Sequence, residues 1–137
     1  MTTQQPVWII GGYQSDFARN FTKESLEIAD LVKETATGTL AGAGICAGQV
    51  EVVHVGNAMG EFYVKQSHLG SMVASVLPEL SGVPATRHEA ACASGGVAVM
   101  AAMAAMTATP PDAQAASCLV AGIPDSSGTT LATMEPR

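Results

Sequence analysis

Apolar and polar positions follow two periods along the chain, one typical of strands and the other of helices. Residues 7–10 (VWII) form a short apolar run closed by two glycines, which predicts a buried strand. From about residue 25 to residue 43, apolar residues recur every three or four positions, with charged residues mostly between them. This spacing predicts a helix that Gly42 or Gly44 can end.

The rest of the chain repeats this alternation. Its expected elements are a strand at 50–55, a helix from about 64 or 67 to 77, an extended segment at 85–89, a long Ala/Met helix at about 92–107 and a strand at 118–121. The resulting β-α-β-α-β-α-β order predicts an α/β fold, with a mostly parallel, mixed sheet and helices on its faces. Reactive groups in such sheets gather at the carboxyl ends of the strands.

The pattern breaks near the end of the chain. Residues 123–137 are rich in Pro, Ser, Thr and Gly and contain few apolar anchors, so we expect an irregular, disordered tail. Residues 1–122 are expected to form one domain. The sheet would then be incomplete at its C-terminal end, with the strand at 118–121 left as an exposed edge.

Composition and charge exclude several classes of protein. The chain of 137 residues is 47% hydrophobic and has a formal net charge of −6, which argues against a nucleic-acid partner. The N-terminus lacks the features of a signal peptide, and three cysteines argue against a disulfide framework, so a reducing cytoplasm is expected. Residues 90–111 carry no charge, but they are rich in small residues, so a buried helix is favoured over a membrane span.

The most informative position is Cys92. It lies in a short glycine-rich junction, residues 88–96 (HEAACASGG), that opens directly onto the apolar run of the Ala/Met helix. A thiol in the first turn of a helix lies at the positive end of the helix dipole, which favours the thiolate. Gly95 and Gly96 remove side chains from the same turn, so a substrate could approach the backbone closely. The position is that of a nucleophile.

The other cysteines and the histidines carry weaker signals. Cys46 follows a predicted helix end and Cys118 begins a predicted strand, so both are expected to be loop or core residues. His54, His68 and His88 show no metal-ligand spacing, and no metal site is expected.

Three methionines repeat along the apolar helix. Met100, Met103 and Met106 fall at three-residue spacing, which is compatible with a flexible ligand groove. A helix that is apolar on all sides is more often buried, so a core role is favoured.

Three segments of the sequence resemble the N-terminal half of a thiolase. They are residues 11–17 (GGYQSDF), 51–58 (EVVHVGNA) and 82–96, of which the cysteine-bearing segment is the most specific. The similarity spans residues 7 to about 122 and is strongest to acetyl-CoA acetyltransferases of the sterol-carrier-protein type.

The resemblance implies a thiolase fold and a covalent role for Cys92. The cysteine would attack an acyl-CoA or acetyl-CoA thioester and carry the acyl group, while its own backbone N–H serves as one oxyanion donor. Coenzyme A thioester is thus expected as substrate, with no tightly bound cofactor. Thiolases are usually dimers, and the segment before the nucleophile lies near the interface, which makes Thr86, Arg87 and His88 interface candidates.

The resemblance also identifies what this chain lacks. The second half of a thiolase supplies an activating His, further oxyanion groups and a second Cys, so a truncated or frame-shifted chain is expected to be inactive alone. Two alternatives remain open. One is a fragment of a ketoacyl-synthase-like condensing enzyme, and the other is a non-catalytic remnant or a subunit that needs a C-terminal partner.

Overall fold

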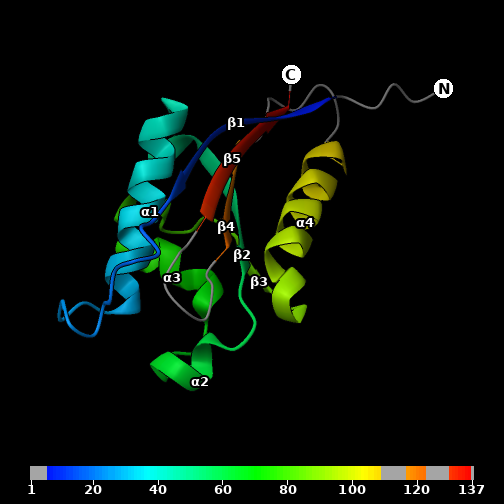
Figure 1. The fold of residues 1–137 in the computed structure, drawn as a ribbon. Helices are drawn as coiled ribbons and strands as arrows, with labels where there is room; N and C mark the ends of the chain where they lie inside the picture. Colours follow the sequence, from blue (N-terminus) through cyan, green and yellow to red (C-terminus); the bar gives the residue numbers. More distant parts are fainter. Residues whose placement is uncertain (1–5, 109–116, 123–129, 137) are drawn as a thin grey trace.

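The computed structural model describes residues 6–108, 117–122 and 130–136, which form a five-stranded sheet with helices on both faces (Figure 1). The strands and helices are β1 (Val7–Gln14), α1 (Ile28–Ala43), β2 (Val50–Gly56), α2 (Gly60–Val64), α3 (Leu69–Val76), β3 (Ala85–His88), α4 (Ser94–Ala108), β4 (Ser117–Gly122) and β5 (Thr130–Pro136). Short 3-10 turns lie at Ala47–Gln49, Pro78–Leu80 and Ala91–Ala93. Apart from α2 and β5, each of these strands and helices has a counterpart in the elements expected from the sequence.

Four of the five strands run in the same direction. The strand order is β1-β5-β4-β2-β3. β2 pairs in parallel with both β3 and β4, whereas β5 is antiparallel to its two neighbours, β1 and β4. The expected α/β fold with a mixed sheet is therefore confirmed.

The end of the chain differs from the expected tail. Residues 130–136 form β5, which pairs along its whole length with β1 on one side and through residues 130–134 with β4 on the other. The prediction of an irregular tail is wrong for these residues, and β4 is not an exposed edge. Ladder hydrogen bonds to two neighbours stabilise this strand, and composition does not reveal such pairing. The rest of the predicted tail, residues 123–129 and 137, lies outside the described residues.

Two glycines that were expected to close the first strand lie inside it instead. β1 continues through them to Gln14, with an irregularity in its pairing between Ile9 and Gly11. A Cβ atom on Gly11 would lie 2.6 Å from the Cα of Ala43, so the glycine allows α1 to lie close against the strand. At this same C-terminal end α1 has the predicted stop, since Gly44 adopts a left-handed conformation (φ 70°) there.

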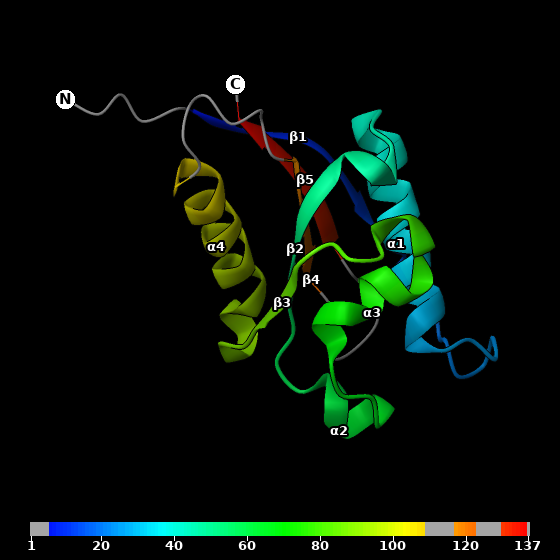
Figure 2. The ribbon, with the colours of Figure 1, turned by 180° about the vertical axis from the view of Figure 1, so that it is seen from behind.

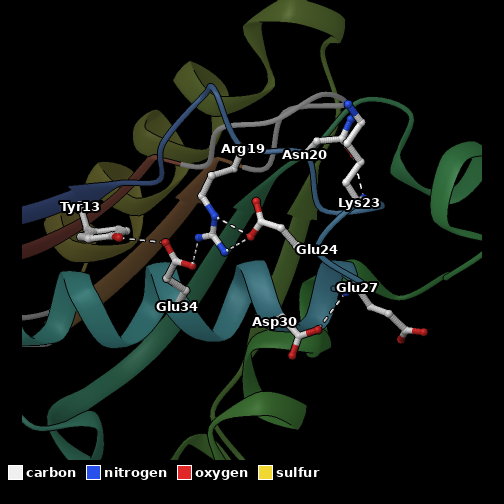
Figure 3. A network of polar contacts seen from close by, with 8 residues as sticks. All are labelled: Tyr13, Arg19, Asn20, Lys23, Glu24, Glu27, Asp30 and Glu34. Atoms are coloured by element: carbon white, nitrogen blue, oxygen red, sulfur yellow. Dashed lines mark hydrogen bonds and ion pairs between the residues drawn. The ribbon is translucent and has the colours of Figure 1, made fainter.

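The segment between β1 and α1 is fastened to α1 by charged side chains (Figure 3). Arg19 donates to Glu34 at 2.6 Å and to Glu24 at 2.7 Å, and the Tyr13 hydroxyl donates to the same Glu34 at 2.9 Å. The helix begins at Ile28, slightly later than expected. This network holds an irregular segment without an apolar core of its own.

The two faces of the sheet are covered unequally. α1 and α3 lie on one face and α4 lies alone on the other, as the two opposite views show (Figures 1 and 2). The larger buried cluster lies on the α1 and α3 side and consists of Val32, Ala36, Leu40, Val50, Val53, Val55, Leu69, Met72, Val73, Leu80 and Leu119. The smaller cluster, on the α4 side, consists of Ala98, Ala102, Met106 and Cys118.

The Ala/Met helix is buried along only one stripe. Met106 is 4% exposed, but Met100 and Met103 are 69% and 45% exposed. The core prediction is confirmed for Met106 and wrong for the other two. The reason is that α4 presses one side against the sheet, and no described residue covers the opposite side. Residues 91–108 are long and apolar enough to cross a membrane, so the expected lack of membrane contact stays a prediction.

Candidate active site

Cys92 lies in the 3-10 turn Ala91–Ala93, between the carboxyl end of β3 and the first residue of α4. Its side chain is exposed. The residue before it, Ala91, has a φ of 47°, a left-handed conformation that residues with a Cβ rarely adopt. A strained residue of this kind is held only where the surrounding structure fixes it, and such residues are common at functional sites. The thiol thus lies at a helix beginning, as predicted, and the structure adds that it is open to solvent.

The backbone N–H groups of the two residues before Cys92 and the two after it each have a hydrogen-bond acceptor, whereas the N–H of Cys92 has none among the described residues. The Ala90 N–H donates to Ser94 Oγ at 2.9 Å, and the Ala91 N–H donates to the Glu89 carboxylate at 2.8 Å. The Ala93 N–H donates to the Ala90 carbonyl at 2.9 Å, and the Ser94 N–H donates to the Ala91 carbonyl. Within the part of the chain that the structure describes, the Cys92 N–H has no acceptor. A free donor therefore lies beside an exposed thiol.

The cysteine turn and the start of α4 lie directly against the end of β2. A Cβ atom on Gly56, at the end of β2, would lie 2.5 Å from the Ser94 carbonyl oxygen and 2.7 Å from the Gly95 Cα. The missing side chain thus lets α4 begin directly against the strand. Gly95 and Gly96 differ from Gly56, because a Cβ atom on either would meet no described atom within 4 Å apart from its chain neighbours and the nearby backbone of its own helix. Their lack of side chains leaves open space at the first turn of the helix.

The segment after β2 is clamped at the same end of the sheet. Arg87 of β3 donates to the carbonyl oxygens of Asn57 and Ala58 at 3.2 and 2.8 Å, and it forms an ion pair with Glu61. Asn57 is buried and accepts the Gly60 N–H at 2.8 Å. Arg87, expected as an interface candidate, is therefore engaged within the chain, while its neighbour Thr86 is exposed on the edge strand.

Two histidines that are 34 residues apart meet on neighbouring strands. His54 Nδ1 lies 2.8 Å from His88 Nε2, and the two share a hydrogen bond. His54 is 7% exposed, and its Nε2 atom has no partner among the described residues. Burial, together with the adjacent His88, lowers the pKa of His54. This pair could not be predicted from the residue pattern, because only the parallel register of β2 and β3 brings the two residues together.

The two other cysteines differ sharply from Cys92. Cys118 is fully buried beneath α4, and burial raises the pKa of its thiol to about 12. Cys46 is exposed before the 3-10 turn Ala47–Gln49, where its N–H donates to the Gln49 side chain at 2.8 Å. The predicted core and loop positions of these cysteines are confirmed. Among the described residues, no three metal-ligating side chains gather at one point.

The sequence matches a known family over most of its length. The family profile described as "Thiolase, N-terminal domain" matches residues 7–127. An acetyl-CoA acetyltransferase of Methanothermobacter thermautotrophicus is 33% identical over 93 residues, which are 68% of this chain and 23% of that protein. An acetyl-CoA acetyltransferase of Methanocaldococcus jannaschii matches with the same identity and coverage. The match thus spans less than a quarter of the length of these curated relatives.

Solved structures share the fold at lower identity. A tetronic acid condensing enzyme superposes with a TM-score of 0.70 at 15% identity, covering 95% of this chain and 52% of that one. A 3-oxoacyl-(acyl-carrier-protein) synthase III from Aquifex aeolicus also gives a TM-score of 0.70 at 15% identity, covering 95% of this chain and 54% of that one. At such identity, the likeness concerns the fold alone.

Proposed function

The chain belongs to the thiolase family, and from this premise we propose that it is the nucleophile-bearing half of a thiolase-type acyltransferase that uses coenzyme A thioesters. Cys92 is the proposed nucleophile and acyl carrier. The observation that carries the proposal is the pairing of an exposed thiol with the one unsatisfied amide of its turn. The acetyl-CoA acetyltransferases among its relatives support the same class of substrate.

The proposed step balances as a thioester exchange. The Cys92 thiolate attacks the carbonyl carbon of the acyl-CoA, and a new carbon–sulfur bond forms while the carbonyl oxygen becomes an oxyanion. The Cys92 N–H donates to that oxyanion, and one fixed donor of this kind contributes about 3–4 kcal/mol to catalysis. Collapse of the intermediate breaks the original carbon–sulfur bond, and coenzyme A leaves as a thiolate that takes up a proton. Gly95 and Gly96 leave room for the substrate at the helix start.

A partner is proposed to complete this site. The outer side of α4 exposes Met100 and Met103 directly after the cysteine turn, and an apolar helix side of this kind is normally covered. The relatives extend far beyond the aligned segment, and their C-terminal half is the proposed cover. That half would supply the base that takes the thiol proton and the second acid. A homodimer through the edge strand β3, where Thr86 is exposed, is the other proposed association.

A condensing enzyme is the second candidate reaction. The solved structures that share the fold are named as condensing enzymes and synthases, which fits a ketoacyl-synthase-like fragment. The family profile and the curated relatives favour the thiolase reaction. A non-catalytic chain remains the third reading, and the cytoplasmic location stays a prediction.

The test is to trap the acyl-enzyme. The chain is incubated with acetyl-CoA, alone and together with a C-terminal thiolase half supplied as a separate polypeptide, and each cysteine peptide is then examined by mass spectrometry. We expect an acetyl group on Cys92, slowly without the added half and faster with it. A Cys92→Ser variant is the control and should gain none. Absence of acetyl-Cys92 in both mixtures, or equal labelling of Cys46, would exclude the thioester reaction.

A further inference from the structure

Ser94 is the one buried hydroxyl within the cysteine turn. The residue is 4% exposed, and its Oγ donates to the Ala91 carbonyl at 2.7 Å while accepting the Ala90 N–H at 2.9 Å. The Ser94 side chain therefore binds one backbone group before the left-handed Ala91 and one after its Cα atom. Glu89 also binds this turn, through the Ala91 N–H, but Glu89 is exposed, so water can replace its carboxylate. Water cannot readily reach the place of the buried serine.

The conformation of Ala91 needs such support. A left-handed conformation is unfavourable for alanine and persists only where neighbouring contacts fix it. Loss of the Ser94 hydroxyl would leave the Ala90 N–H and one bond of the Ala91 carbonyl unsatisfied in a partly buried turn. A turn relaxed in this way would point Cys92 in a different direction and would let its N–H find an acceptor.

We propose that Ser94 is a positioning residue for Cys92. Its hydroxyl fixes the left-handed turn at Ala91, and that turn presents the thiol and its free amide together on the open side of the helix beginning. The role rests on the proposed function, in which Cys92 is the nucleophile. Ser94 itself is not proposed to touch the substrate.

The chain contains a matched control for this arrangement. At the start of α3, Ser71 Oγ donates to the carbonyl of His68 at 2.9 Å, and His68 is itself left-handed with a φ of 57°. The residue spacing is the same as between Ser94 and Ala91. Ser71, however, is exposed, and the residue directly after His68 is a leucine, not a cysteine. Ser71→Ala thus removes a similar hydroxyl from an unrelated turn.

The experiment measures the rate of iodoacetamide labelling at Cys92 relative to Cys46 in the same molecule, under conditions where circular dichroism shows the chain folded. We expect Ser94→Ala to lower this ratio about tenfold, the size of effect that follows from losing buried hydrogen bonds. Ser94→Thr, which keeps the hydroxyl, should restore most of the ratio. Ser71→Ala should leave it unchanged.

A second variant separates positioning from folding. Glycine adopts a positive φ without strain, so Ala91→Gly in the Ser94→Ala chain should recover part of the lost ratio and also keep the chain folded if the single variant is unstable. An unchanged ratio in a folded Ser94→Ala chain, or no recovery in the double variant, would overturn the proposal. Labelling does not require acyl transfer. A chain that shows the Ser94 effect but gains no acetyl group would retain the positioning role and lose the proposed function.

Discussion

The two faces of the sheet differ in how completely they are covered. The face under α1 and α3 is closed by a large buried cluster drawn from several elements. The face under α4 has a small cluster of two alanines, a methionine and a cysteine, and the helix that covers it is itself half exposed. Cys92, the proposed nucleophile, and its turn lie at the beginning of α4. The comparison teaches that the first face provides most of the buried core, whereas the second leaves one side of its helix exposed, next to the proposed nucleophile.

Removing a large side chain from each face should give the greatest contrast. Leu69 is fully buried on the closed face, so Leu69→Ala should lower the free energy of unfolding by about 2–5 kcal/mol. Met100→Ala on the open face should change it by no more than about 0.5 kcal/mol, because the side chain is 69% exposed. Urea denaturation of the two variants measures both. Equal losses would contradict the unequal roles of the faces.

Disruption of the contact between β2 and the start of α4 should cause the next largest loss in the free energy of unfolding. A Cβ atom at Gly56 would lie 2.5 Å from a backbone oxygen of Ser94, so Gly56→Ala must displace the helix beginning. We expect a loss of about 1–3 kcal/mol in the free energy of unfolding and slower labelling of Cys92. Gly48→Ala, which places a Cβ in open space, is the control. Normal labelling in Gly56→Ala would show that the strand does not position the turn.

Substitution of the two glycines after Cys92 should affect the stability of the fold and the acetylation of Cys92 in opposite directions. Gly95→Ala and Gly96→Ala add a side chain to a helix without meeting any other described segment within 4 Å, so each should stabilise the fold by about 0.5–1 kcal/mol. Acetylation of Cys92 by acetyl-CoA should fall, because the added methyl group occupies the space left for the substrate. Thermal unfolding and mass spectrometry measure the two effects. Stabilised variants with unchanged acetylation would remove these glycines from the substrate site.

A smaller, pH-dependent effect is expected from the histidine pair. The pKa of His54 is lowered in the folded chain, so the unfolded chain binds more protons as the pH falls below about 6.5. The free energy of unfolding should therefore decrease from neutral pH toward the lowered pKa and then level off with respect to this group.

Two variants test whether this dependence belongs to the pair. Urea denaturation at several pH values should show a weaker pH dependence in His54→Gln. His68→Gln, which alters an exposed histidine outside the pair, should behave like the unsubstituted chain. An equal pH dependence in all three proteins would assign the effect to other groups.

Local sequence signals predicted where Cys92 lies, but they did not predict the burial of α4 or the backbone conformation next to the cysteine. The glycine-rich junction before an apolar run placed Cys92 at a helix beginning, because turn residues and helix periodicity are properties of the local chain. The exposed side of α4 could not be predicted, since a helix that is apolar all round does not reveal which side the chain itself covers. The left-handed Ala91 could not be predicted either, because residue pattern does not reveal that the Ser94 hydroxyl binds back to the Ala91 carbonyl.

Pairing between distant segments was the main unpredicted feature of the fold. β5 joins the sheet between β1 and β4, and His54 meets His88, only because the strands adopt a particular order and register. The sequence of residues 130–136 (TLATMEP) contains β-branched and apolar residues, a weak strand signal that the surrounding Ser, Gly and Pro residues obscured.

The central claim is tested most directly by timed iodoacetamide labelling of the unsubstituted chain across pH, with each cysteine followed by peptide mass spectrometry. The account predicts that Cys92 is labelled first and Cys46 more slowly. Cys118, which is buried and has a pKa raised to about 12, should be labelled only on unfolding. A Cys92 that reacts no faster than Cys46 at any pH would contradict the claim that its turn presents an activated nucleophile.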